Sequence, residues 1–140
     1  MRIYLVAGSA PIKNLKKAVP SPKRVLVTYL DYDNTYELIK DSDVVIDSAM
    51  FWRKKKPMTK KDLFYFMDEY IRFINKVKDR KHIQWFAEMD YYGYFPTPTV
   101  DQVRKELEGQ TGAYILPVYH LFQPIERLYQ FTESYPYIGV

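Results

Sequence analysis

The sequence has no cysteine, only two histidines and no long apolar run. The absence of cysteine excludes disulfides, zinc–thiolate sites and a thiol nucleophile. His82 and His120 do not have the spacing of a metal-binding motif such as H-E-x-x-H, so we expect neither a metal nor another cofactor. No apolar run is long enough to span a bilayer, and the cations near the start follow the apolar residues, unlike those of a signal peptide. We therefore expect a soluble, cytoplasmic protein that does not associate with membranes.

Glycine is also scarce, with five residues in the chain. Gly8 follows a predicted strand, but neither G-x-G-x-x-G nor G-x-x-x-x-G-K-[ST] is present, which argues against a nucleotide site built on a glycine loop. The G-x-S-x-G motif is absent as well, so Ser48 is a poor candidate for a nucleophile.

The composition predicts one folded domain. The chain has 140 residues, of which 47% are hydrophobic and 17% aromatic, enough to form a core in a single domain over 1–140. The net charge is only +4, although six cations lie between positions 53 and 61. A local cluster on a balanced background favours a loop that faces a polyanion, and the alternative is a solvated loop. The cluster consists of Arg53, Lys54, Lys55, Lys56, Lys60 and Lys61.

Short apolar segments alternate with amphipathic ones along the chain. Several of the apolar segments are hydrophobic on consecutive residues, which is typical of parallel strands covered on both faces. The predicted strands are 2–7, 24–30, 44–47, 83–89, 114–120 and 135–140. Helices are predicted after Thr59, after Thr99 and near Pro124, with a shorter one over 35–39. This rhythm predicts an α/β fold built from parallel βα units.

Two parallel architectures fit this rhythm. One is a partial (β/α)8 barrel and the other is a small doubly wound open sheet. A complete barrel needs roughly 200–250 residues, so this chain accounts for a little over half of one. The final segment, YPYIGV, reads as a strand with no helix after it. We therefore expect an incomplete barrel that lacks its C-terminal half.

Candidate site residues follow the predicted strands. Asp47, Ser48 and Phe51 follow the third strand, Asp90 the fourth and His120 the fifth. The carboxyl ends of parallel strands meet at one edge of a sheet, where active sites form. Two carboxylates and an imidazole at successive strand ends therefore predict a site. The alternative is that the aspartates cap helices or form turns and that the histidine is structural.

Three segments resemble tRNA-guanine transglycosylases and their phage and bacterial relatives that insert 7-deazaguanines into DNA. VVIDSAMF resembles the strand and loop D-S-G-[GA]-F of this family, and FAEMDYYG resembles the strand whose terminal aspartate recognises the purine. ILPVYHLFQPIERLYQFTESYPYIGV resembles the next two units. The likeness runs from about residue 24 to the end, with the segments in the family's order and spacing.

The resemblance implies a (β/α)8 barrel that exchanges guanine for a 7-deazaguanine in tRNA or DNA through a covalent intermediate. Asp47 would be the general acid/base carboxylate at the glycosidic nitrogen, and Phe51 would lie against the base. Asp90 would accept hydrogen bonds from the Watson–Crick edge of the purine. Ser48 and His120 would complete the polar rim, Gly139 would give backbone access, and the cation cluster would bind phosphates beside a flipped guanosine.

The chain also departs from the family pattern. Ala49 and Met50 replace two glycines, and His120 stands where glutamine is usual. The family's nucleophilic aspartate and cysteine–zinc module have no counterpart in these residues. We therefore expect a homo-oligomer, or a second chain that completes the barrel. Two alternatives remain: a non-catalytic nucleic-acid or protein-binding module of the same fold, and an unrelated doubly wound protein.

Overall fold

The computed structural model describes residues 5–7, 22–50 and 58–140. The predicted α/β fold of parallel βα units is confirmed. The described elements are, in chain order, β1 (Leu5–Ala7), β2 (Arg24–Thr28), α2 (Tyr32–Ile39), β3 (Asp43–Asp47), α4 (Lys60–Val77), β4 (Ile83–Ala87), α5 (Thr97–Thr111), β5 (Ile115–Leu116) and α6 (Ile125–Ser134).

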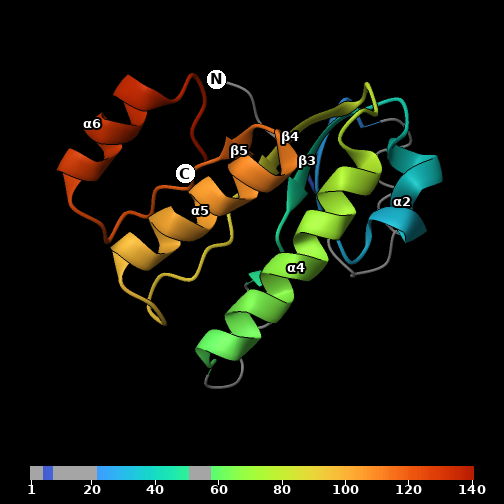
Figure 1. Ribbon diagram of the computed structural model, residues 1–140. Helices are drawn as coiled ribbons and strands as arrows, with labels where there is room; N and C mark the ends of the chain where they lie inside the picture. Colours follow the sequence, from blue (N-terminus) through green and yellow to red (C-terminus); the bar gives the residue numbers. More distant parts are fainter. Residues whose placement is uncertain (1–4, 8–21, 51–57) are drawn as a thin grey trace.

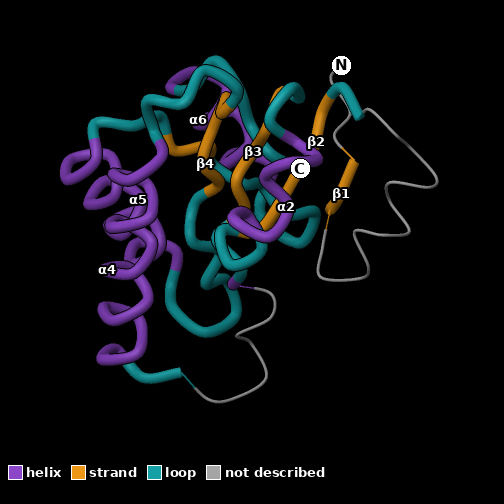
Figure 2. The backbone as a smooth tube through the Cα atoms, turned by 90° about the vertical axis from the view of Figure 1, so that its right-hand side faces the viewer, coloured by secondary structure: helices purple, strands orange, loops and turns teal. Residues whose placement is uncertain are grey.

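The five named strands form one parallel sheet in the order β1-β2-β3-β4-β5. Each strand therefore pairs with the strand that precedes it in the chain, as the tube in Figure 2 shows for β2, β3 and β4. The strand predicted over 135–140 is reduced to a single parallel bridge between Val118 and Gly139. Its position continues the same order beyond β5.

The helices form a layer in which each contacts the next. Helices α4 and α5 lie in front of the sheet in Figure 1, and Figure 2 shows both on one side of the strands. Tyr32 of α2 packs edge-on against Phe73 of α4, with ring centroids 5.5 Å apart. Arg104 of α5 lies 5.0 Å from the ring centroid of Phe131 in α6. The helix order thus follows the strand order.

The core lies between β3, β4 and α4. Val44 and Ile46 of β3 and Ile74 of α4 are fully buried. The side chain of Tyr70, also fully buried, reaches between the strands, where its hydroxyl donates to the carbonyl oxygens of Ile46 at 3.2 Å and Ala87 at 3.0 Å. Burial raises the pKa of Tyr70 well above its ordinary value. The hydroxyl is thus a satisfied core group.

Two of the four predicted helix starts are placed correctly to within a residue, and the short helix predicted over 35–39 begins earlier, at Tyr32. Thr59 caps α4, because its hydroxyl accepts from the Asp62 amide at 3.2 Å while Asp62 accepts from the Thr59 amide at 2.8 Å. Pro124 directly precedes α6. Ile125, the first residue of this helix, is apolar but 48% exposed. Arg127 is buried instead, because it pairs with the neighbouring helix.

The predicted cap at Thr99 is wrong. Helix α5 begins at Thr97 and includes Pro98 in its first turn, where the missing amide hydrogen of proline costs nothing. No side-chain hydrogen bond caps this helix start. The helix ends before Gly112, which has φ of 64° and occupies the left-handed position that glycine favours.

Candidate functional site

Asp47 ends β3 and forms a tight turn with its own chain. Its Oδ1 accepts a hydrogen bond from the amide of Ala49 at 2.6 Å. Ala49 has φ of 60°, a left-handed conformation that is unusual for a residue other than glycine. Ser48 is 3% exposed, and its hydroxyl donates to the carbonyl oxygen of Glu88 at 3.0 Å. Ser48 thereby ties the exit of β3 to the exit of β4.

Asp90 follows β4 and makes the same kind of turn, since its Oδ1 accepts from the amide of Tyr92 at 3.3 Å. The same oxygen lies 3.1 Å from Nε2 of His120, which follows β5. This is an ion-pair distance, although the Nε2 atom is buried and makes no aligned hydrogen bond. The structure therefore brings together two of the predicted residues that lie thirty positions apart in the sequence.

The imidazole of His120 is held between two aromatic rings. Tyr92 packs edge-on against it at a centroid distance of 5.3 Å, and Phe122 stacks on it at 5.2 Å with 20° between the ring planes. The backbone amide of His120 donates to Oε1 of Gln123 at 3.0 Å, and the amide of Gln123 donates to the carbonyl oxygen of His120 at 2.8 Å. These bonds close a turn that fixes the position of the imidazole.

Gly139 lies beside this turn, at the bridge to Val118. Its amide donates to Pro117 and its carbonyl oxygen accepts from Tyr119, both at 2.8 Å. Both backbone groups of Gly139 are thus paired within the chain. A Cβ atom at this position would lie 3.2 Å from the Cγ2 atom of Val118, so the close approach of the two segments favours glycine.

The predicted site residues that the structure describes therefore share one edge of the sheet. Asp47 is the last residue of β3, and Gly139 forms the bridge beyond β5. The other three follow β3, β4 and β5 in turn: Ser48, Asp90 and His120. Lys60 and Lys61 are exposed at the start of α4, which follows the same edge. Phe51 and the remaining cations, Arg53, Lys54, Lys55 and Lys56, lie outside the described residues. Met50 is 1% exposed and belongs to the hydrophobic core.

Sequence reasoning missed one charged residue at this edge. Glu88 is 1% exposed, and its Oε2 lies 2.7 Å from Nη1 of Arg104. Its Oε1 accepts from the amide of Val118 at 2.8 Å. Burial raises the pKa of the Glu88 carboxyl, and the charge of Arg104 opposes this shift. An acidic residue inside the otherwise apolar segment 83–89 was the signal that could have identified it.

The charged network continues into α6. Nη2 of Arg104 and Nη2 of Arg127 lie 2.8 and 2.7 Å from Oδ1 of Asp101. Arg127 also donates to the hydroxyl of Tyr92, the ring that packs against His120. Burial acts to raise the pKa of Asp101, but the hydrogen bond from Arg127 and the charges of both arginines outweigh it, so this pKa is lowered. The network therefore contacts the candidate site through Tyr92, whose ring packs against His120.

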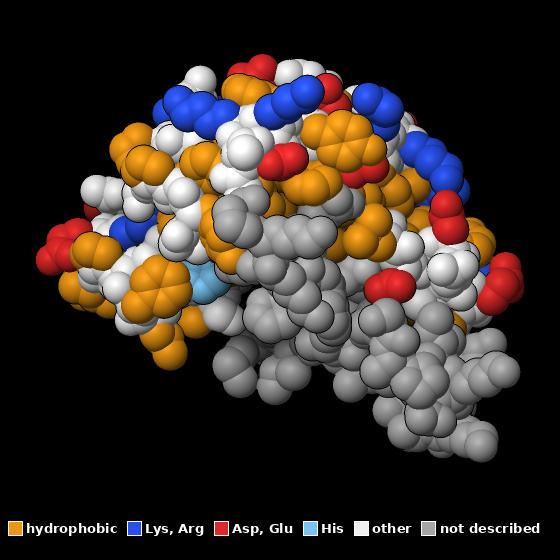
Figure 3. Space-filling view, turned by 90° about the horizontal axis from the view of Figure 1, so that it is seen from below, with side chains coloured by type: hydrophobic (Ala, Val, Ile, Leu, Met, Phe, Trp, Pro, Cys, Tyr) orange, Lys and Arg blue, Asp and Glu red, His pale blue; other side chains and the backbone are white. Residues whose placement is uncertain are grey.

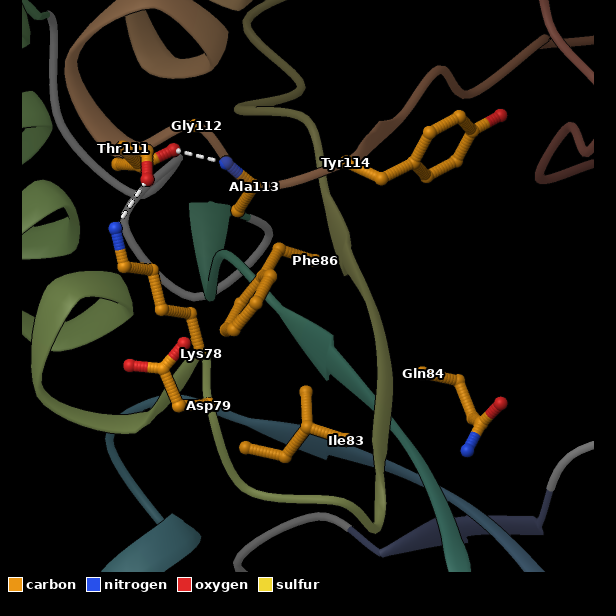
Figure 4. Close-up of a pocket in the computed structure, with 9 residues that line it drawn as sticks. All are labelled: Lys78, Asp79, Ile83, Gln84, Phe86, Thr111, Gly112, Ala113 and Tyr114. Carbon is orange, nitrogen blue, oxygen red and sulfur yellow. Dashed lines mark hydrogen bonds between the residues drawn. The ribbon is translucent and has the colours of Figure 1, made fainter.

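A separate hollow lies at the opposite edge of the sheet, near the amino ends of β4 and β5. Its volume is about 260 Å³. In Figure 4, Lys78 reaches across one side of this hollow, where its Nζ donates to the carbonyl oxygen of Thr111 at 2.5 Å. Phe86 and Ile83 line its floor beside Lys78. None of the rim residues contributes to this hollow.

Within the described ranges, no three histidine, aspartate or glutamate residues are grouped so that they could hold a metal ion. The helices in these ranges include none with the length and apolar character needed to cross a membrane. No protein-family model matches the chain, and no curated protein or solved structure matches it either.

Proposed function

We propose that this chain is a base-exchange protein similar to tRNA-guanine transglycosylases, which replaces guanine by a 7-deazaguanine in tRNA or DNA. The observation that carries the proposal is the pairing of Asp90 with His120 at 3.1 Å, beside Asp47 on the same strand edge. These residues follow β3, β4 and β5 in the order that the resemblance requires. The left-handed backbone of Ala49 supports it further, because the family has glycine there.

The strand order favours a partial barrel. In a (β/α)8 barrel each strand lies beside its predecessor, whereas a doubly wound sheet reverses its order at a switch point. The five strands here follow chain order without a reversal. A second copy or a second chain supplies the remaining strands in this proposal. Because this chain has no cysteine and no counterpart of the family's nucleophilic aspartate, the nucleophilic carboxylate and the zinc module come from a different second chain in this proposal.

Each predicted site residue at this edge of the sheet then has a role. Asp47 gives a proton to the leaving guanine and takes one from the incoming 7-deazaguanine, while the partner's carboxylate forms and later releases the bond to C1′. Asp90 accepts hydrogen bonds from the Watson–Crick edge of the purine, and His120 orients its carboxylate. Ser48 holds the exits of β3 and β4 together. Lys60 and Lys61, with the other cations of 53–56, bind the flanking phosphates.

Base binding tests this proposal without requiring a complete enzyme. Calorimetric titration with guanine and with 7-deazaguanine should show binding to the 140-residue chain, and Asp90→Asn should weaken it at least about tenfold, the contribution of one hydrogen bond to a charged group. Asp47→Asn should leave this binding unchanged. The proposal would be contradicted if the chain bound neither base, or if Asp90→Asn bound them as tightly as the wild type.

The reaction itself needs the partner. We would measure solution mass by light scattering for the chain alone and with the products of neighbouring genes. The resulting assembly should exchange radiolabelled guanine into tRNA or duplex DNA, and Asp47→Asn should abolish the exchange while the assembly persists. A chain that stays a stable monomer beside every neighbour contradicts the partial barrel.

A second candidate function is a non-catalytic nucleic-acid-binding module. It is favoured by the turns in which Asp47 and Asp90 accept hydrogen bonds from residues two positions later, because a turn-forming aspartate needs no catalytic role. In that case, a Lys60→Glu/Lys61→Glu variant should lose affinity for nucleic acid, while Asp47→Asn should have no effect on any measured property except stability.

A further inference from the structure

We propose that Phe122 provides a stacking surface for a nucleobase next to the exchanged guanosine. This inference rests on the proposed function, because it names how the same rim holds the flanking nucleotide. It starts from one exposed aromatic ring. Phe122 is 74% exposed, although a phenylalanine in a folded domain is usually buried.

The ring of Phe122 stacks on the imidazole of His120, and Tyr92 packs edge-on against the same imidazole. Tyr92, the innermost ring, is 7% exposed. The side chain of His120 is 25% exposed and lies between the two. The planes of His120 and Phe122 differ by 20°, so one face of the Phe122 ring lies toward the imidazole and the opposite face is left for a ligand. A flat ligand that lies on Phe122 would extend this stack by one layer.

The position of Phe122 is fixed by its turn. His120 and Gln123 exchange two hydrogen bonds across it, at 2.8 and 3.0 Å. The hydroxyl of Tyr119 also donates to the carbonyl oxygen of Gln123 at 2.9 Å. An exposed ring on a restrained backbone loses little conformational freedom when a ligand stacks on it. Every nucleobase offers a flat π-face, so the contact does not require a particular base.

Two cations at the same edge of the sheet offer phosphate contacts for the nucleotide strand of the proposed function. Lys60 and Lys61 are exposed at the start of α4, where the chain leaves the edge after β3. Figure 3 looks at the molecule from below, the side on which α4 begins in Figure 1, and shows a histidine side chain beside hydrophobic ones. Cations that attract phosphates and an aromatic ring that stacks bases are the two parts of a single-strand binding surface.

Binding of a short oligonucleotide tests the inference. Fluorescence anisotropy at low salt would measure the affinity of the full chain for a fluorescein-labelled single strand with one central guanosine. Phe122→Ala should weaken binding about tenfold, since stacking on one aromatic ring contributes on the order of this factor. Phe122→Trp should keep the affinity or raise it. Leu121→Ala is the matched control, because Leu121 is the adjacent residue and is 87% exposed, and it should bind like the wild type.

Three outcomes would overturn the inference. Phe122→Ala and Leu121→Ala could both bind like the wild type, Phe122→Leu could bind as well as Phe122→Trp, or both alanine variants could lower the solution mass, which would make this surface a contact between copies of the chain. Thermal unfolding of each variant shows whether the turn remains folded. Weaker oligonucleotide binding by Phe122→Ala without any guanine binding would leave the stacking contact standing and remove the proposed function. Guanine binding that depends on Asp90, together with unchanged oligonucleotide binding by Phe122→Ala, would do the reverse.

Discussion

Glu88 and Arg104 form an ion pair at 2.7 Å in which the carboxylate side chain is fully buried and the guanidinium side chain is 5% exposed. The pair joins the end of β4 to the middle of α5. The carboxylate also accepts from the amide of Val118, which follows β5. One buried charge pair therefore connects the segments that follow β4 and β5 with helix α5.

Glu88→Gln should destabilise the protein by about 3 kcal/mol, because the change leaves the buried Arg104 without its closest charge partner. Urea unfolding followed by circular dichroism measures this. Glu37→Gln is the matched control: it removes an equally short ion pair, with Lys40, that is exposed and should not affect stability measurably. Equal effects of the two variants would show that the buried pair has no special role.

Asp101 should make stability depend on acid pH. Its pKa is lowered from 3.8 in the folded protein, so the folded state binds this proton less tightly than the unfolded chain. The carboxylate therefore contributes stability above the unfolded value, and this contribution is lost as the pH falls through the folded value. The unfolding free energy of the wild type should drop more steeply below pH 3.8 than that of Asp101→Asn. Gln102→Ala, at the exposed neighbouring position, should follow the wild type, and parallel curves for all three proteins would contradict the prediction.

Thr59→Ala should destabilise the protein by about 1 kcal/mol, because it removes the hydroxyl that caps α4. Thr59→Ser should retain the cap. Thr99→Ala is the control, since α5 has no side-chain cap and alanine has the higher helix propensity. Chemical denaturation of the three variants checks this prediction, and it fails if Thr99→Ala is as destabilising as Thr59→Ala.

Ala49 should tolerate glycine but not a β-branched residue. Relief of the left-handed conformation, about 1 kcal/mol, opposes the loss of a buried methyl group, about 0.8 kcal/mol, so Ala49→Gly should change stability by less than about 1 kcal/mol. Ala49→Val should cost more than about 2 kcal/mol, because a β-branched side chain strains this backbone and must fit a fully buried position. Thermal unfolding distinguishes the two, and a stable Ala49→Val would exclude a strained turn at Asp47.

The sequence predicted elements that local chemistry determines. The capping box at Thr59 and the left-handed Gly112 depend on residues close in sequence, so helix α4 and the end of α5 were predictable. Consecutive apolar residues in β3 likewise reflect burial on both faces. The strand over 135–140 was predicted too long, because its extent depends on which segment lies beside it.

The candidate site was predicted only in part for the same reason. The positions of Asp47, Asp90 and His120 at the ends of predicted strands indicated that they share one edge of the sheet, because parallel topology brings such positions together. Whether Asp90 contacts His120, and whether Arg127 rather than Ile125 is buried in α6, depends on side-chain packing between distant segments. Glu88 was missed because its partner, Arg104, lies on a separate helix.

The unbroken strand order also has a consequence for synthesis on the ribosome. Because each strand after β1 pairs with the named strand made before it, that neighbour is already present when the new strand leaves the exit tunnel. Val25 pairs with the earlier Leu5, and Ile115 pairs with the earlier Phe86. The sheet can therefore assemble one βα unit at a time from the amino end, because the strand made last always forms the edge with which the next strand pairs.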